Sequence, residues 1–130
     1  MCSSDLWFPA EDWRANEDYL FGVDLYNAGF LWEAHEAWEG LWHSAKHDAL
    51  QAEHLQGLIQ CTAAALKVRM EQPRGLAALS KLGTERLERV TSEARGSYMG
   101  LDVAAFVEAF RAFAASEPED AESRPRLVLG

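Results

Sequence analysis

The stretch FLWEAHEAWEGLWH, residues 30–43, holds the side chains of this chain that are best suited to chemistry. His35, Glu39 and His43 recur every four residues, so a helix would place them in one stripe. Within the stretch, HEAWE offers an imidazole and a carboxylate one turn apart, with Glu36 between them. The layout is that of the zinc-protease motif HExxH, with Glu39 in place of the second histidine. Zinc, manganese and iron accept both ligand types, so the spacing is compatible with a metal or acid–base site.

A hydrogen-bonded structural network is the other interpretation of the same stripe, and we favour it. Trp32 falls inside the stripe, and an ordinary solvent-facing side of a helix does not need a tryptophan. We therefore expect the stripe to line a cleft between helices, with Gln56 or Gln60 of the third helix within hydrogen-bond reach. Covered polar groups need such partners, because an unpaired buried one costs about 1–3 kcal/mol.

A metal would need more ligands than this helix supplies. His35 and His43 are eight residues apart, which is about 12 Å of helical rise, so they would not hold one ion together. A site would combine His35 and Glu39 with donors from elsewhere, such as His47 or His54. We assign no cofactor from the sequence, and a divalent metal stays the alternative.

The elements that must position these residues are helices, because apolar residues recur with helical period throughout and no strand alternation is convincing. Gly29 suits a left-handed turn, Asp48 with Gln51 has the spacing of a capping box, Pro73 suits a first helical turn and Asp102 can act as an N-cap. These signals predict an all-α fold, a compact bundle of about five antiparallel helices. The helices run over about 10–26, 30–44, 49–70, 73–92 and 103–115.

The third predicted helix is the expected centre of the core. Its apolar arc is wide, and Gly57, Cys61 and Ala64 along one edge would let another helix approach closely. The first hairpin is tetratricopeptide-like, because Gly22 and Ala34 are spaced as the small packing residues of that repeat are. We divide the chain into an N-terminal extension (1–9), one helical domain (10–115) and a loose acidic tail (116–130), whose terminal LVLG could dock.

Charge and composition narrow the function classes. The formal net charge is −9, and residues 1–66 alone hold eleven acids against two bases, which argues against nucleic-acid or membrane binding. Residues 67–95 hold seven bases against four acids, and the simplest interpretation is a solvated helix face. We expect a cytoplasmic protein, since no apolar run would cross a bilayer and the N-terminus does not look like a secretory signal. Two unpatterned cysteines do not make a disulfide framework.

Three stretches resemble the bacterial and archaeal family catalogued as domain of unknown function 309. They are LYNAGFLWEAHEAWEGLW at 25–42, LQGLIQCTAAALK at 55–67 and YMGLD at 98–102. The resemblance implies a compact all-α fold and supplies no activity or substrate. The chain has EQPRG at 71–75, where the family often shows a Gly-Asn turn. The resemblance marks these family-motif positions: Asn27, Gly29, Glu33, His35, Glu36, Glu39, Trp42, Gln56, Gly57 and Gln60.

We predict a small helical interaction domain that binds a protein, a peptide, a small molecule or a second copy of itself, without chemistry. The alternative is a metal-assisted hydrolase that uses the HEAWE helix, with His35 and Glu39 as candidate ligands. Asn27, Gly29 and Gly57 are interpreted as structural positions. The candidate cleft residues are Trp32, His35, Glu36, Glu39, His43, Gln56 and Gln60.

Overall fold

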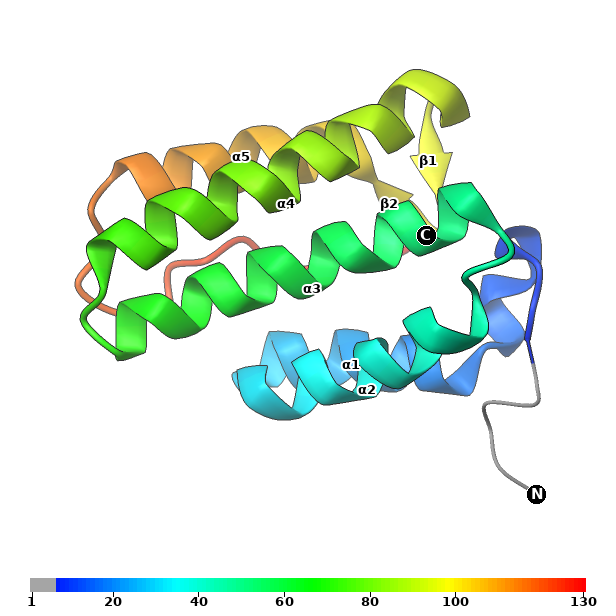
Figure 1. Ribbon diagram of the computed structural model, residues 1–130, viewed down its shortest axis with the longest axis horizontal. Coiled ribbons are helices and arrows are strands. Elements are labelled where there is room, and N and C mark those ends of the chain that lie inside the picture. The colour runs from blue at the N-terminus through cyan, green and yellow to red at the C-terminus, as the bar shows by residue number, and fades with distance from the viewer. Residues whose placement is uncertain (1–6) are drawn as a thin grey trace.

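The computed structural model describes residues 7–130, and this part of the chain is built almost entirely from helices (Figure 1). The predicted all-α class is confirmed. Residues 1–6 of the predicted N-terminal extension lie outside the described residues. No helix of the described chain has the length and apolar character needed to cross a membrane. The elements are η2 (Ala10–Ala15), α1 (Glu17–Ala28), α2 (Leu31–Ser44), α3 (Ala49–Arg69), α4 (Pro73–Ala94), β1 (Ser97–Tyr98), β2 (Leu101–Asp102) and α5 (Val103–Ala115).

Local signals in the sequence set most of the helix ends. Gly29 adopts a left-handed conformation (φ 95°) after α1, where a side chain would be strained. The Asp48 and Asp102 carboxylates accept hydrogen bonds from backbone N–H groups of the first turns of α3 and α5, at 3.2 and 3.1 Å. Pro73 begins α4, where its missing N–H has no intrahelical role. Four predicted helices therefore begin and end within two residues of their predicted limits.

The predicted first helix, 10–26, is wrong in one respect. The chain forms the 3-10 helix η2, breaks at Asn16 and restarts as α1. The Asn16 side chain accepts a hydrogen bond from Tyr19 N at 3.2 Å, so it is the N-cap of α1. Helical periodicity continues across the break, which is why the pattern alone suggested one helix. The predicted loop 95–102 also contains a small antiparallel hairpin of β1 and β2.

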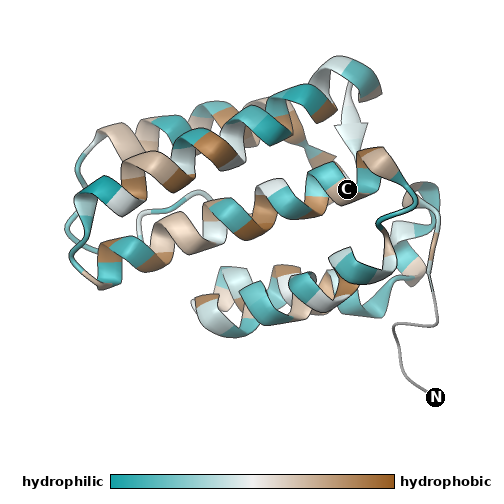
Figure 2. Cartoon of the chain, viewed as in Figure 1, coloured by the Kyte–Doolittle hydropathy of each residue, from teal (hydrophilic) through white to brown (hydrophobic). Residues whose placement is uncertain are grey.

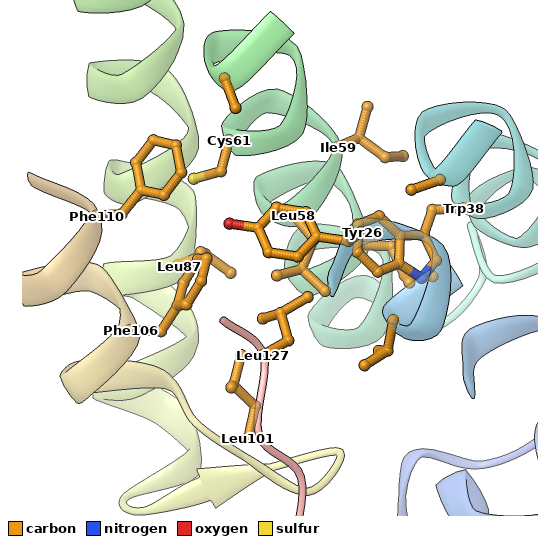
Figure 3. Close-up of a cluster of buried hydrophobic side chains, with 14 of the residues drawn as sticks. Tyr26, Trp38, Leu58, Ile59, Cys61, Leu87, Leu101, Phe106, Phe110 and Leu127 are labelled. Atoms are coloured by element: carbon orange, nitrogen blue, oxygen red, sulfur yellow. The ribbon is translucent and has the colours of Figure 1, made fainter. Parts of the chain in front are cut away.

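Helix α3 is the central element, as predicted (Figure 1). It packs against α2 on one side and α4 on the other, while α1 completes a hairpin with α2 and α5 packs on α4. Apolar and polar residues alternate along the helices in Figure 2, as expected where one face of each helix is buried. Several of the buried side chains are drawn in Figure 3. Residues with no exposed surface in the core are Tyr19, Leu31, Ala34, Trp38, Ala45, Leu55, Cys61, Ala64, Ala65, Leu87, Val90, Val103 and Phe110.

The backbones of α3 and α4 approach closely at two glycines. A Cβ on Gly57 would lie 2.7 Å from Leu87 Cγ, and one on Gly83 would lie 2.8 Å from Cys61 Sγ and 3.0 Å from Gly57 O. All three distances are shorter than an ordinary contact of a Cβ atom with a carbon, sulfur or oxygen atom. The prediction that the Gly57 edge of α3 admits another helix is thus confirmed, and the partner helix is α4.

The segment 116–130, predicted to be loose, is docked on the helices. Ala121, Arg124 and Leu127 are 1%, 7% and 3% exposed. Arg124 Nη2 donates to Tyr26 O at 2.6 Å, which satisfies a carbonyl in the last turn of α1. The net negative charge of the segment suggested a solvated tail, but its apolar and arginine side chains are spaced to reach the core. Figure 3 shows Leu127 among the buried side chains, beside Leu101.

We expect Gly83→Ala to lower the free energy of unfolding by about 1–3 kcal/mol, because the new methyl group would meet the α3 backbone. Gly40→Ala is the matched control. Gly40 is also helical, but a Cβ there would meet nothing within 4 Å, so alanine should stabilise the helix by about 0.5–1 kcal/mol. Urea unfolding of both variants measures the difference. If Gly83→Ala is as stable as the wild type, the two backbones are not in contact.

Candidate functional site

The predicted stripe of polar residues lies on the outer face of α2. Glu36, Glu39 and His43 are exposed, and Trp32 keeps 58% of its surface in solvent. Leu31, Ala34, Trp38 and Leu41 of the same helix face the core instead. The expected cleft between this stripe and α3 is therefore wrong for Trp32, which looks outward.

Trp32 covers His35, and this contact explains why a tryptophan stands in a polar stripe. The two rings are parallel to within 6°, with centroids 5.6 Å apart. The indole shields one face of the imidazole, so no third helix is needed to cover it. His35 Nδ1 is buried and lies 3.8 Å from Glu39 Oε2, which is too long for a direct hydrogen bond. His35 and Glu39 are neighbours, but they do not form the tight pair of a preformed network.

The glutamines of α3 do not complete the predicted network. Gln60 Oε1 accepts a hydrogen bond from Arg86 Nε of α4 at 3.0 Å. Gln56 is half-buried, and its amide makes no hydrogen bond to another described residue. The Gln60 side chain therefore faces α4 rather than the stripe on α2.

At the same α3–α4 surface, two arginines of the basic stretch 67–95 pair with a carboxylate of α3. Glu53 accepts hydrogen bonds from both Arg86 and Arg89, the latter at 2.6 Å. Burial would raise the pKa of Glu53, but the hydrogen bonds from Arg89 and Arg86 outweigh it, and the pKa falls below its usual range. Arg111 forms a bidentate pair with Glu88 at 2.8 and 3.1 Å. These cations are engaged with carboxylates of the chain itself.

A metal centre would need at least three donors in one place. Within residues 7–130, no group of three His, Cys, Asp or Glu side chains is arranged to hold an ion. His35 and Glu39 supply two donors at most, and His54 is buried on another helix. The described chain holds no complete set of donors for the metal-assisted alternative.

Sequence reasoning missed a buried polar cluster. His54 and Tyr19 have no exposed surface, and Tyr19 Oη lies 3.2 Å from His54 Nε2. Since the Tyr19 hydroxyl donates to Met99 O at 2.9 Å, its oxygen accepts from a protonated Nε2. The Tyr98 ring stands edge-on to His54 at 5.0 Å. The cluster ties α1, α3 and the β1–β2 hairpin together.

Burial keeps the members of this cluster uncharged. It lowers the pKa of His54 to about 3 and raises the pKa of Tyr19 above its usual range. A neutral imidazole with no exposed surface has no access to a substrate, so it holds the fold rather than performing catalysis. His54 is thus a packed core histidine rather than the additional metal donor that the sequence left open. Burial likewise raises the pKa of the Cys61 thiol, which keeps it protonated.

The three positions predicted as structural have different roles. Gly29 makes the left-handed turn, and Gly57 makes the close contact with α4. Asn27 acts beyond its own turn: Nδ2 donates to Leu127 O and Oδ1 accepts from Leu127 N, both at 2.8 Å. Nothing near Asn27 in the chain indicated this pairing, because its partner lies 100 residues away.

Comparison with known proteins finds a family match over part of the chain. Residues 19–79 match the family model described as Domain of unknown function (DUF309). The chain is similar to DUF309 over that stretch. This confirms the resemblance predicted from the sequence, and the family description assigns no activity. No curated protein and no solved structure matches the chain.

The DUF309 match covers the outer face of α2 and half of the buried cluster. It runs from Tyr19 through α2 and α3 into α4, so it includes Trp32, His35 and His54. It does not include the docked segment 116–130 or the β1–β2 hairpin. The family-matched part therefore supplies the helical framework and the exposed stripe together.

The buried state of His54 should make stability depend on pH. The pKa is about 3 in the folded protein and about 6.5 when unfolded, so between these values the unfolded state binds more protons. This contribution to the free energy of unfolding should therefore fall as pH drops from about 6.5 to about 3, by up to about 1.4 kcal/mol per pH unit. His54→Gln should lose that slope, while His43→Gln, which alters an exposed histidine, should keep it.

Chemical denaturation across this pH range measures the effect. Titration of many carboxylates adds a background slope, so the informative quantity is the difference between wild type and variant at each pH. The stability advantage of the wild type over His54→Gln should shrink as pH falls. Parallel curves for the two proteins would show that His54 does not titrate as a buried neutral group.

Proposed function

We propose that this protein is a helical interaction domain that binds a basic segment of a partner protein through the outer face of α2. The observation that carries the proposal is the exposed, stacked Trp32 beside Glu36 and Glu39, on a helix with no lysine or arginine. The proposal concerns binding without chemistry.

Trp32 has the properties of an anchor for a partner. Trp32 is 58% exposed, yet its indole is held in a parallel stack on the His35 ring. A side chain that is already held in place loses less conformational entropy when a partner covers it. Tryptophan is also enriched among the residues that dominate binding energies.

The charge of this face favours a basic partner. Glu33, Glu36 and Glu39 are exposed, and none of them forms an ion pair with a lysine or arginine in the described chain. A lysine or arginine of a partner would gain these carboxylates, and an arginine would also stack on the Trp32 indole. Exposed carboxylates increase the association rate with a positively charged partner. This electrostatic attraction weakens as salt is added.

The test uses a short fluorescent peptide rich in arginine and leucine, with binding measured by fluorescence anisotropy. Trp32→Ala should weaken binding about tenfold, which corresponds to about 1.4 kcal/mol. Leu82→Ala is the matched control, because Leu82 is 48% exposed but lies on α4, and it should leave the affinity unchanged. Trp32→Ala does not alter net charge, so a loss of affinity reports the aromatic anchor rather than general attraction to an acidic protein.

A second variant isolates the electrostatic part. Replacing both Glu36 and Glu39 by glutamine should weaken binding and flatten its dependence on salt. If Trp32→Ala, the double glutamine variant and Leu82→Ala all bind the peptide as the wild type does, the outer face of α2 is not the binding surface.

A further inference from the structure

An extended segment of the chain, residues 124–130, lies against the end of α1 and beside β2. Leu129 forms an antiparallel bridge with Leu101 of β2, and Gly130 N donates to Gly100 O at 2.9 Å. Tyr26, in the last turn of α1, donates its hydroxyl proton to Pro125 O at 2.7 Å. The segment is thus held along its length by hydrogen bonds to its backbone.

Asn27 recognises this segment as a peptide backbone. Its amide donates to Leu127 O and accepts from Leu127 N, both at 2.8 Å. One side-chain amide therefore reproduces the paired hydrogen bonds that a neighbouring strand would make. Because both bonds go to the main chain, they place no demand on the side chain at that position.

Specificity comes from alternate side chains, as it does when a strand is added to a protein surface. Leu127 points inward and is 3% exposed, and Leu129 is half-buried. Arg126 and Val128 point outward, and Val128 is 75% exposed. The groove thus selects leucine at two positions and tolerates other residues between them.

Arg124 adds a charged contact at the start of the segment. Its guanidinium donates from Nη2 to Tyr26 O at 2.6 Å and lies 5.1 Å from the Tyr26 ring centroid. A cation at this point meets the carbonyl end of α1, where the helix dipole favours positive charge. The surrounding part of the chain is acidic, since residues 1–66 hold eleven acids and two bases.

A hollow of about 350 Å³ follows the groove along α1. Its walls include Leu20, Val23 and Asp24 of α1 on one side and residues 126–129 on the other. The segment therefore covers only part of the α1 surface beside it. Apolar and acidic side chains of α1 line the space that remains.

We propose that the end of α1 and the edge of β2 form a peptide-binding site for an extended segment of the form Arg-x-x-Leu-x-Leu, filled in this chain by its own residues 124–129. A partner protein that carries such a segment binds by replacing residues 124–129. The receptor residues Tyr26 and Asn27 lie inside the DUF309 match, whereas the segment lies outside it. This site shares no residue with the proposed binding face of α2.

The experiment uses the full chain and a labelled peptide with the sequence ESRPRLVLG, residues 122–130, with binding followed by fluorescence anisotropy. Leu127→Asp should release the internal segment and leave the groove intact, so it should bind the peptide at least about tenfold more tightly than the wild type. Val128→Asp is the matched control, because it adds the same charge at the exposed neighbouring position and should bind no better than the wild type. Adding Asn27→Ala to Leu127→Asp should abolish the gain.

Circular dichroism establishes whether Leu127→Asp keeps its helices. A folded variant that binds the peptide no better than Val128→Asp would overturn the proposal. A wild-type dimer that forms with rising concentration and disappears in Leu127→Asp would also overturn it, in favour of exchange of the segment between two copies.

Hydrogen exchange of the wild type tests the same site if the variant does not fold. The Leu127 and Gly130 amides should exchange through a local opening, faster than the amides of Leu58 and Ile59 in α3. Excess peptide in solution should not slow the α3 amides. Equal protection of the segment and α3 would show that residues 124–130 are an inseparable part of the core, and would overturn the proposal.

Discussion

Direct contact between the backbones of α3 and α4 is the constraint on which the arrangement of the other helices depends. Because Gly57 and Gly83 have no side chains of their own, the two main chains approach closely, and a Cβ on Gly83 would lie 3.0 Å from Gly57 O. With α4 fixed on one side of α3, the α1–α2 hairpin occupies another, and the bulky core side chains of α2 fill the space between. Because α2 buries Leu31, Trp38 and Leu41 there, its opposite side is necessarily exposed. The outward position of Trp32 follows from this packing.

Two groups of polar residues in the described chain have different consequences for function. His54 and Tyr19 are buried and hydrogen-bonded to each other, and Tyr19 also donates to Met99 O. Burial keeps both side chains neutral. They link elements and are closed to other molecules. The carboxylates of α2 remain hydrated and are free to meet a partner. Function is therefore better sought on the exposed helix face and in the groove at the end of α1 than in the interior.

Local chemistry made most of the fold predictable. A glycine after α1, aspartates before α3 and α5 and a proline at the start of α4 act within one turn of the residues they affect, so the sequence itself displays their effect. The break at Asn16 was missed because apolar spacing continues through it, although the Asn16 N-cap acts only on the first turn of α1. The candidate site was predictable only in part: its residues were correctly placed in one stripe, but the stripe's surroundings were not.

The sequence by itself determined the helices, their amphipathic faces and the glycine edge of α3, because each follows from spacing within one segment. Only the tertiary structure decided which faces meet. A helical wheel gives the direction of Gln60 around α3 and of His35 around α2. It does not show that Gln60 accepts a hydrogen bond from Arg86, or that His35 stacks on Trp32. Nor does it give the pairing of Asn27 with Leu127, because a hydrogen bond between residues 100 positions apart depends on where the whole chain brings its ends. Long-range partners leave no periodic trace, since the chain between them can take any path that closes the loop.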